Sequence, residues 1–511
     1  MADLKKAIGK LLMVGIPGES ASQAFLEEIQ EWSVGGVIFF ARHLKSLETV
    51  KSDMKKIIEA CGYEPLFAVD HEGGPVLRFN DTVSELPAPM ALVSAGGGDL
   101  IRRASCFAAI ELAELGFNTN LAPVCDINEI NNPGIGIRSF GENPQDVSKC
   151  VYLAATGFHE GGVLTSAKHF PGKGAALVDA HVAMPVVEVT RQRLVERELL
   201  PFKAALKAGT KIIMSSHMLF PNLDKDNPVT FSRKIVDDLI RGELDFDGIV
   251  ISDDLEMGGS RELAEPSDAA LMCLKGGHDM AMICHTFEAQ CHARRKIFEA
   301  VENGTLPQAL VEEKVERIDR VLEDIEMVRK NSSSRDTCNF DEEEMNNFAA
   351  RGIICTSENL SVLPFIQDEF SQINLYVPDL SLSTPSADDR SGVLSFIEDL
   401  LDLKYSNLNV LRFALDGTKQ NDWESRLSLS GSEKDRNSIA SIIFTNNAHL
   451  HEGQISLLSS VYENSKITLH VALRNPYDLD LLQADGNKLV SVATYGFRQN
   501  TLKALVDVLH F

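Results

Sequence analysis

The sequence contains no apolar run of the roughly 20 residues that a membrane-spanning helix needs. Its N-terminal stretch also lacks the pattern of a secretion signal. Lys5, Lys6 and Lys10 fall within an amphipathic segment that has no unbroken apolar core and no small-residue cleavage site. These absences predict a cytoplasmic protein that does not bind a membrane.

The nine cysteines form no CxxC pair and no Cys/His cluster with metal-ligand spacing. Their odd number and scattered positions favour reduced thiols over a disulfide framework or a zinc site. A Gly-rich phosphate-binding fingerprint is also missing, because the three glycines at 96–98 lack the GxGxxG spacing. We therefore expect no metal and no other cofactor.

Positive charge is scarce, with 49 Lys and Arg against 74 Asp and Glu and a formal net charge of −25. A protein with this charge repels nucleic acid and anionic membranes, so we expect neither as a partner. The length of 511 residues predicts two or more domains.

The first two thirds of the chain alternate short β-rich runs with longer helical patterns. Eight candidate strands lie at Leu11–Val14, Val34–Ala41, Pro65–Asp70, Thr119–Asp126, Val163–His169, Lys211–His217, Gly248–Asp253 and Asp279–Cys284. Helical stretches follow Ser46, Thr190 and Ser232, which are candidate N-caps, and Gly209 is a candidate helix stop. This alternation predicts a (β/α)₈ barrel over residues 1–329.

Polar residues stand where five of the predicted strands end. They are Asp70, Asp126, the pair Lys168 and His169, His217, and Asp253. Catalytic groups of a (β/α)₈ barrel lie at the carboxyl ends of its strands, so these residues predict an active site at one mouth of the barrel.

The residue types at these strand ends suit glycoside hydrolysis. Asp253 follows a buried-strand pattern and can act as the nucleophile of a retaining mechanism. His181 can donate and then remove a proton, because the ordinary pKa of histidine is about 6.5, and Asp179 can orient its ring. The candidates for hydrogen bonds to sugar hydroxyls and an acetamide are Asp70, Arg78, Arg138, Lys168 and His169.

Bland interpretations stay open for some of these residues. Arg78 and Arg138 can equally be surface residues that pair with the excess of acid. For Asp254 we favour a role as the N-cap of the following helix.

Six motifs resemble glycoside hydrolase family 3, and most closely its β-N-acetylglucosaminidase branch. They lie at Ala68–Phe79, Leu121–Asn128, Ile137–Pro144, Lys168–His181, Met214–Pro221 and Gly248–Gly259, in the order found in the family. The resemblance implies that Asp253 is the nucleophile and that Asp179 and His181 form an acid/base dyad. It also implies that the five hydrogen-bonding candidates named above contact the substrate.

Four positions depart from the family pattern: Lys173 stands where a His is usual, His71 for a Gln, Pro75 for an Arg and Glu256 for a small residue. Lys173 brings a positive charge into the loop of the dyad. There we expect it to act on His181 or to bind an acidic aglycone.

The Ser-rich stretch 330–341 predicts a linker, and residues 342–511 predict a second domain. Its candidate strands alternate with helical patterns and lie at 373–379, 409–416, 441–447 and 466–479. This pattern predicts a three-layer α/β sandwich. Residues 472–479 and 493–496 resemble the second domain of longer family members, which we expect to be structural or to form one wall of the site.

These observations together predict a retaining exo-β-N-acetylglucosaminidase. Its expected substrates are N-acetylglucosamine-containing oligosaccharides or muropeptides, with a role in peptidoglycan recycling. One alternative is a β-glucosidase or a phosphorylase of the same family, because a neutral histidine does not repel phosphate as a glutamate would. Another alternative is a sugar-binding protein with weak catalysis.

Overall fold

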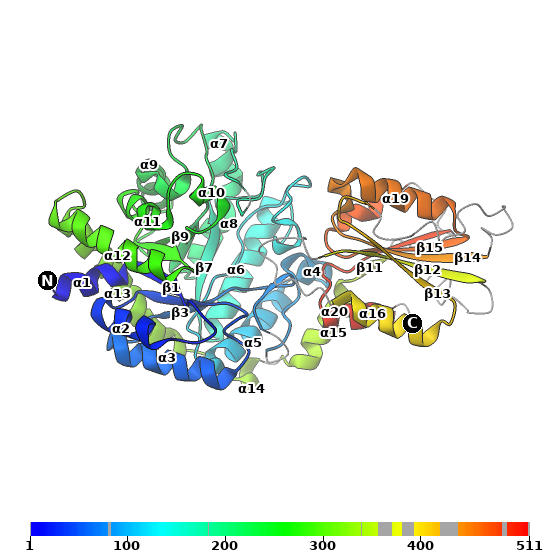
Figure 1. Cartoon of the computed structure of the whole chain (residues 1–511), viewed down its shortest axis with the longest axis horizontal. Helices are drawn as coiled ribbons and strands as arrows, with labels where there is room; N and C mark the ends of the chain where they lie inside the picture. Colours follow the sequence, from blue (N-terminus) through cyan, green and yellow to red (C-terminus); the bar gives the residue numbers. More distant parts are fainter. Residues whose placement is uncertain are drawn as a thin grey trace.

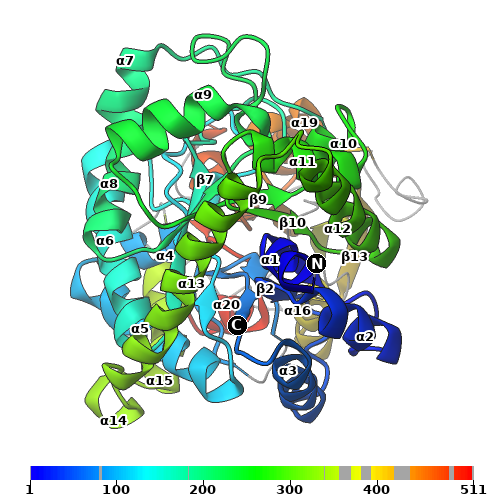
Figure 2. The same cartoon turned by 90° about the vertical axis from the view of Figure 1, so that its left-hand side faces the viewer.

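The computed structural model describes residues 2–79, 83–181, 183–338, 340–355, 370–380, 393–418, 438–482 and 488–508. It has two lobes, a helix-wrapped barrel that contains the N-terminus and a smaller C-terminal lobe beside it (Figure 1). In the view turned by 90°, the barrel lies in front of the C-terminal lobe (Figure 2). Of the helices in these segments, none combines the length and the apolar character that a membrane crossing requires.

Eight parallel strands close into a barrel in the order β1-β10-β9-β8-β7-β6-β3-β2. Their bounds are β1 Leu12–Gly15, β2 Gly36–Phe39, β3 Leu66–Val69, β6 Thr119–Asn120, β7 Leu164–Phe170, β8 Ile212–Ser215, β9 Ile249–Asp254 and β10 Met280–Ile283. Almost every residue in them is buried, as expected for parallel strands that are covered by helices outside and side chains inside. Each strand overlaps a segment expected from the sequence, so the predicted barrel is confirmed.

Helices cover the outside of the barrel. The longer ones are α1 Ala2–Lys10, α2 Gln23–Trp32, α3 Leu47–Cys61, α5 Asp99–Leu115, α6 Pro144–Glu160, α8 Leu199–Lys207, α11 Pro266–Lys275, α12 Phe287–Glu302 and α13 Gln308–Lys330. Shorter elements are α4 Pro89–Ser94, α7 Arg191–Arg193, α9 Arg233–Ile235, α10 Gly258–Arg261, the 3₁₀ turns η1 Gly136–Arg138 and η3 Val229–Phe231, and the π-helical η2 Leu194–Glu198 and η4 Val236–Glu243. The N-cap predictions are confirmed, because the side chains of Ser46, Thr190 and Ser232 each accept a hydrogen bond from a backbone N–H three residues later.

A short antiparallel hairpin, β4 His71–Gly73 with β5 Val76–Leu77, follows β3 and was not expected from the sequence. The glycines of its turn require their positive φ angles, and a Cβ at Gly73 would lie 2.3 Å from the carbonyl oxygen of Pro87. The hairpin therefore holds the residues after Asp70 close to the barrel mouth.

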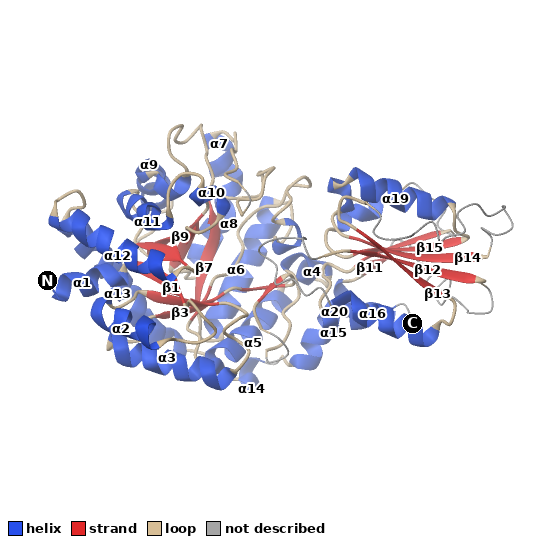
Figure 3. Cartoon of the chain, in the orientation of Figure 1, coloured by secondary structure: helices blue, strands red, loops and turns tan. Residues whose placement is uncertain are grey.

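The C-terminal lobe is built on a six-stranded sheet in the order β11-β16-β15-β14-β12-β13, parallel except for the β11–β16 pair. Its strands are β11 Ile354–Cys355, β12 Gln372–Pro378, β13 Leu408–Phe413, β14 Ile439–Thr445, β15 Ile467–Ala472 and β16 Leu489–Ala493. The sheet lies between α19 (Glu452–Glu463) on one face and α16 (Val393–Lys404) and α20 (Gln499–Val508) on the other (Figure 3), with 3₁₀ turns η7 (Ala448–Leu450) and η8 (Pro476–Asp480) at its strand ends. This arrangement is the predicted three-layer sandwich.

The segment between the two sheets packs against the barrel. It contains α14 (Arg335–Cys338) and α15 (Glu342–Gly352), and buried Phe340 and Phe348 belong to the same apolar cluster as the barrel core. The predicted boundaries, a barrel at 1–329, a linker at 330–341 and a second domain at 342–511, stay a prediction.

Candidate active site

A cavity of about 470 Å³ opens at the carboxyl ends of the barrel strands. It is lined by Ile38, Phe40, Ala41, Arg42, Asp70, Glu72, Val76, Arg78, Leu121, Arg138, Lys168, His169, His181, Met214, Asp253, Asp254, Glu256, Met257, Gly258, Met282, Cys284 and His285. The structure thus brings seven of the eight predicted site residues to one cavity. The eighth, Asp179, lies directly behind His181.

Asp253 projects from the end of β9 into this cavity, and its Oδ1 accepts a hydrogen bond of 2.9 Å from the backbone N of Asp254. Burial works to raise the pKa of this carboxyl, whereas the neighbouring His169, His217 and Lys173 lower it. The net shift of the pKa is downward. Asp253 is therefore a half-buried, ionised carboxylate, the form that a nucleophile requires.

Asp179 and His181 form a hydrogen-bonded dyad. Nδ1 of His181 lies 2.7 Å from Oδ1 of Asp179, and the same oxygen accepts from the backbone N of His181 at 3.0 Å. Burial works to raise the pKa of Asp179, but the hydrogen bond from His181 and the charge of Lys173 bring it well below its usual range. Nε2 of His181 has no hydrogen-bond partner in the described part of the chain, so it is available to a ligand in the cavity.

Lys173 does not face the cavity as an aglycone-binding residue, which corrects that expectation. Its side chain is 2 % exposed, and Nζ lies 3.9 Å from Oδ1 of Asp179. Its backbone N donates to Oδ1 of Asp126 at 2.6 Å. The positive charge is therefore buried behind the dyad, where it stabilises the ionised form of Asp179.

Asp70, Arg78 and Lys168 form an ionic group that also lines the cavity. Asp70 accepts from Nη2 of Arg78 at 2.8 Å and from Nζ of Lys168 at 2.7 Å. Burial opposes ionisation of Asp70, but the two cations outweigh it and lower its pKa. These three predicted residues are thus held together and are not scattered surface charges.

Glu72 joins this ionic group, although we did not select it from the sequence. Nε and Nη2 of Arg138 donate to its two oxygens at 2.8 and 2.9 Å, and Nζ of Lys168 lies 2.5 Å away. Burial acts against the ionised form, yet the two cations lower the pKa of Glu72 to about 2. In the sequence, only its position two residues after Asp70 pointed to Glu72. The hairpin that contains it was not evident from the hydrophobic periodicity.

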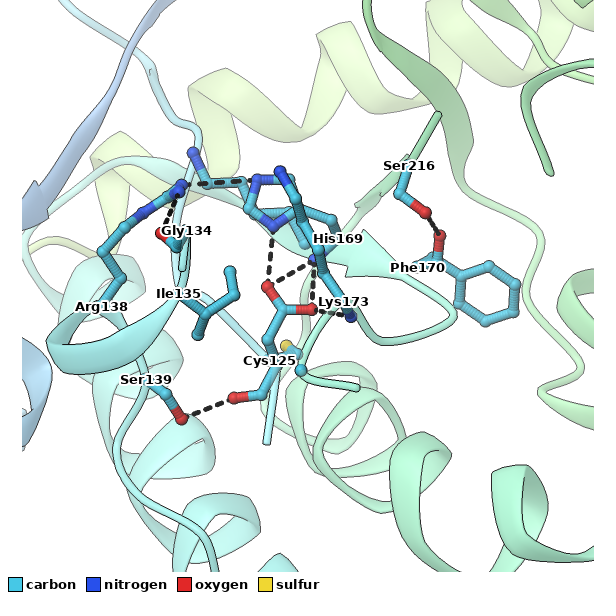
Figure 4. Close-up of polar contacts among 12 residues, drawn as sticks. Cys125, Gly134, Ile135, Arg138, Ser139, His169, Phe170, Lys173 and Ser216 are labelled. Atoms are coloured by element: carbon cyan, nitrogen blue, oxygen red, sulfur yellow. Dashed lines mark hydrogen bonds and ion pairs between the residues drawn. The ribbon is translucent and has the colours of Figure 1, made fainter. Parts of the chain in front are cut away.

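His169 lies between Arg138 and the carboxylate of Asp126 (Figure 4). Its Nδ1 is 2.7 Å from Oδ2 of Asp126, and Nη2 of Arg138 lies 3.5 Å from its Nε2. Since the guanidinium can only donate, Nε2 accepts and the proton sits on Nδ1. Burial keeps the pKa of His169 well below its usual value, so the ring is neutral.

Asp126 accepts from three donors, the ring of His169 and the backbone N–H groups of His169 and Lys173. Burial is the largest influence on its carboxyl and raises its pKa to about 6. It ends a strand that the sequence predicted, whereas β6 of the structure stops at Asn120, and only the structure shows that Asp126 orients His169.

Asp254 is not a helix N-cap, so this interpretation was wrong. The helix that follows, α10, begins after Met257, and no side chain caps it. The Oδ1 atom of Asp254 instead accepts from the backbone N of Glu256 at 3.1 Å and of Cys284 at 3.3 Å. The carboxylate thereby joins the end of β9 to the end of β10.

The cavity wall contains other residues that the sequence did not single out. Phe40 and Arg42 follow β2, and His285 follows β10. The guanidinium of Arg42 lies 4.8 Å from the ring centre of Phe40, whose ring is 4.9 Å from that of His285. Arg42 and His285 directly follow predicted strands and Phe40 lies near the end of one, and this was their only signal in the sequence.

Within the described residues, no group of three or more His, Cys, Asp or Glu side chains is arranged to hold a metal ion. All nine cysteines are free thiols, and eight of them are buried. The titratable side chains that line the cavity are carboxylates, imidazoles, a lysine, arginines and the thiol of Cys284.

Comparison with known proteins gives the family. The model of the glycosyl hydrolase family 3 N-terminal domain matches residues 3–321. A β-hexosaminidase of Methylococcus capsulatus is 33 % identical over 276 residues, which are 53 % of this chain and 81 % of that protein. A β-hexosaminidase of Shewanella frigidimarina is 33 % identical over 281 residues, or 54 % and 82 % of the two chains.

A solved structure of a family 3 β-N-acetylglucosaminidase from Paenibacillus sp. str. FPU-7 superposes with a TM-score of 0.82 at 29 % identity. The match covers 99 % of this chain and 96 % of that one, so the likeness includes both lobes. The resemblance inferred from the six motifs is confirmed, and this chain belongs to glycoside hydrolase family 3, whose members act on the O-glycosyl bonds of carbohydrates.

Proposed function

We propose that this glycoside hydrolase is a retaining exo-β-N-acetylglucosaminidase that uses Asp253 as nucleophile and the Asp179–His181 dyad as acid/base. The observation that carries the proposal is the dyad itself, a 2.7 Å hydrogen bond that leaves one ring nitrogen of His181 available at a cavity shared with an ionised Asp253. The names of the two curated relatives and of the Paenibacillus structure support the acetamido sugar as substrate.

In the first step, a carboxylate oxygen of Asp253 attacks C1 of the sugar and the bond from C1 to the leaving oxygen breaks. Nε2 of His181 donates its proton to that oxygen, and Asp179 stabilises the ring in the orientation required. In the second step, His181 removes a proton from water, which attacks C1 and releases Asp253. The two steps invert C1 twice, so its configuration is retained.

Substrate recognition is assigned in this proposal to Asp70, Arg78, Arg138, Lys168 and His169. Their mutual ion pairs hold each donor and acceptor in one orientation, which directional hydrogen bonds to sugar hydroxyls require. The proposed substrates are N-acetylglucosamine-containing oligosaccharides or muropeptides. The nine free thiols fit the proposed location in the cytoplasm.

The test is the release of nitrophenol from its β-N-acetylglucosaminide and its β-glucoside, with and without phosphate. We expect turnover of the acetamido sugar alone, no turnover by Asp253→Ala, and a fall of roughly 10²–10⁴-fold in His181→Ala, the usual contribution of a general acid. Exposed Asp238 and His292 serve as matched control positions, where the same changes should have no effect.

Three outcomes would contradict the proposal. Normal turnover by Asp253→Ala would show that Asp253 is not the nucleophile. A rate that depends on phosphate would make the enzyme a phosphorylase. Tight sugar binding by a folded wild type without any turnover would show that the protein binds sugar but does not hydrolyse it.

A further inference from the structure

The loop that carries the dyad, residues 171–181, is built on a second loop of the barrel. Asn132 of that second loop donates from Nδ2 to the carbonyl oxygens of Lys173, Gly174 and Ala176 at 2.8, 2.9 and 3.0 Å. Its Oδ1 accepts from the backbone N of Gly134 and of Ile135. We call residues 171–181 the acid/base loop and residues 128–136 the supporting segment.

The dyad itself lies against the supporting segment. A Cβ on Gly134 would be 2.9 Å from Oδ2 of Asp179, so the carboxylate packs directly on this glycine. Any displacement of the supporting segment therefore displaces Asp179, and with it the ring of His181.

The C-terminal lobe holds this same segment from the other side. Nδ2 of Asn128 donates to the hydroxyl of Tyr477 at 2.7 Å, and Nε2 of His449 donates to the carbonyl oxygen of Ile130 at 3.0 Å. Asn475 fills the space over Gly136, where a Cβ would lie 2.3 Å from its Oδ1. All three lobe residues follow the carboxyl ends of β14 and β15.

His449 is anchored within its own lobe before it reaches the barrel. Its Nδ1 lies 2.8 Å from Oδ1 of the buried Asp478, which also accepts from the hydroxyl of Thr445 and two backbone N–H groups. One ring nitrogen faces the carboxylate of Asp478 and the other faces the carbonyl oxygen of Ile130, so the imidazole joins the two lobes.

A buried cation of the C-terminal lobe adds an electrostatic link. Arg474 follows β15, is 1 % exposed, and its charge acts attractively on Asp179 and repulsively on Arg138. Burial is the largest influence on its pKa and lowers it to about 10, so the guanidinium remains charged at neutral pH.

From these contacts we infer that the C-terminal lobe positions the acid/base dyad, through His449, Tyr477 and Asn475 acting on the supporting segment. The inference rests on the proposed function for the role of the dyad. The three side chains are positioning residues, since they reach the reacting atoms only through residues 128–136. The lobe thereby controls proton transfer, although none of its described residues lines the cavity.

Proton transfer has a kinetic signature that a general loss of structure does not share. A mispositioned acid slows the departure of a poor leaving group and leaves an acidic one, which departs without a proton, nearly unaffected. We therefore compare kcat/KM for the 2,4-dinitrophenyl and phenyl β-N-acetylglucosaminides in wild type, Tyr477→Phe and His449→Phe. Tyr477→Phe removes a single hydroxyl and keeps the ring.

The expected result is a fall of about 10-fold or more on the phenyl glycoside and of less than about 3-fold on the dinitrophenyl glycoside, a smaller version of the pattern in His181→Ala. Arg412→Ala, on the outer strand β13, should change neither rate. Arg498→Lys weakens a different contact between the lobes, the hydrogen bonds to the carbonyl oxygens of Gly74 and Leu77 in the hairpin. It should lower both rates equally.

Equal losses on both glycosides in Tyr477→Phe and His449→Phe would overturn the inference. Hydrogen–deuterium exchange of residues 171–181 tests the inference without a measurement of activity. We expect faster exchange in His449→Phe and not in Arg412→Ala. Unchanged exchange would contradict it. A wild type inactive on all acetamido glycosides would refute the proposed function, while the exchange result would still decide the inference.

Discussion

The neutral ring of His169 depends on Asp126, whose carboxylate is fully buried and yet accepts a hydrogen bond from it. With the proton on Nδ1, the contact is between a carboxylate and a neutral imidazole, not an ion pair. A buried carboxylate without a cationic partner in contact is costly to ionise, which explains why burial raises the pKa of Asp126 to about 6.

This shifted pKa predicts a pH dependence of stability. The folded-state pKa of about 6 lies above the ordinary value of 3.8, so the folded protein binds this proton more tightly than the unfolded chain does. The resulting stabilisation is complete below pH 3.8 and is lost as the pH rises through 6. One pKa unit corresponds to about 1.4 kcal/mol, so the free energy of unfolding of wild type should fall by about 3 kcal/mol between these pH values. Asp126→Asn should not show this fall.

Urea unfolding of wild type and Asp126→Asn at several pH values from 4 to roughly 7 measures this difference. Exposed Asp146→Asn is the control and should follow wild type. The variant should also be a poorer enzyme, because its amide would offer a donor to the Nδ1–H of His169. Parallel stability curves for wild type and Asp126→Asn would contradict the assignment of the raised pKa.

The acid/base loop touches the chain just before the supporting segment through backbone atoms, and glycine makes this possible. A Cβ on Gly174 would lie 1.7 Å from the carbonyl oxygen of Ile127, far inside van der Waals contact. The two loops can approach this closely only because position 174 has no side chain.

Gly174→Ala should therefore displace the acid/base loop and lower kcat by about 10²-fold, the cost expected for a misplacement of about 1 Å. The proposed substrate-binding residues lie outside the acid/base loop, with Lys168 and His169 fixed in strand β7, so KM should change little. Gly18→Ala is the matched control, because the nearest atom to its new Cβ is 3.8 Å away. Steady-state kinetics of both variants give the comparison, and full activity in Gly174→Ala would show that the loop tolerates the shift.

At the scale of the whole molecule, the two lobes share a small apolar cluster. Met90, Ala91 and Ile137 of the barrel pack against Ala472, Ala493 and Tyr495 of the C-terminal lobe. The polar contacts of His449, Tyr477 and Arg498 also join the two lobes. Burial of apolar surface at the junction favours unfolding of both lobes together.

Tyr495→Ala should weaken this coupling by about 3 kcal/mol, as for the loss of a large buried aromatic side chain. Differential scanning calorimetry should then resolve two transitions, one for each lobe, where the wild type shows a more cooperative one. Tyr462→Ala, in α19, removes the same side chain away from the junction and should leave the transition undivided. A single transition in Tyr495→Ala would mean that the polar contacts alone couple the lobes.

The sequence by itself determined the barrel, the sandwich and the residues of the cavity wall that end strands. Buried parallel strands appear in the sequence as continuous apolar runs, and helix N-caps such as Ser46 and Ser232 are recognised from neighbouring residues alone. Asp253, Asp179 and His181 were proposed because Asp253 directly follows such a run and because Asp179 and His181 are two residues apart.

Only the tertiary structure decided the contacts between segments that lie far apart in the chain. Glu72 meets Arg138 across 66 residues, His169 meets Asp126 across 43, and Ile130 meets His449 across 319. It also showed that Lys173 lies behind the dyad and that Asp254 is not the expected N-cap. Such outcomes depend on how loops pack on one another, and packing in three dimensions leaves no periodic trace in a sequence.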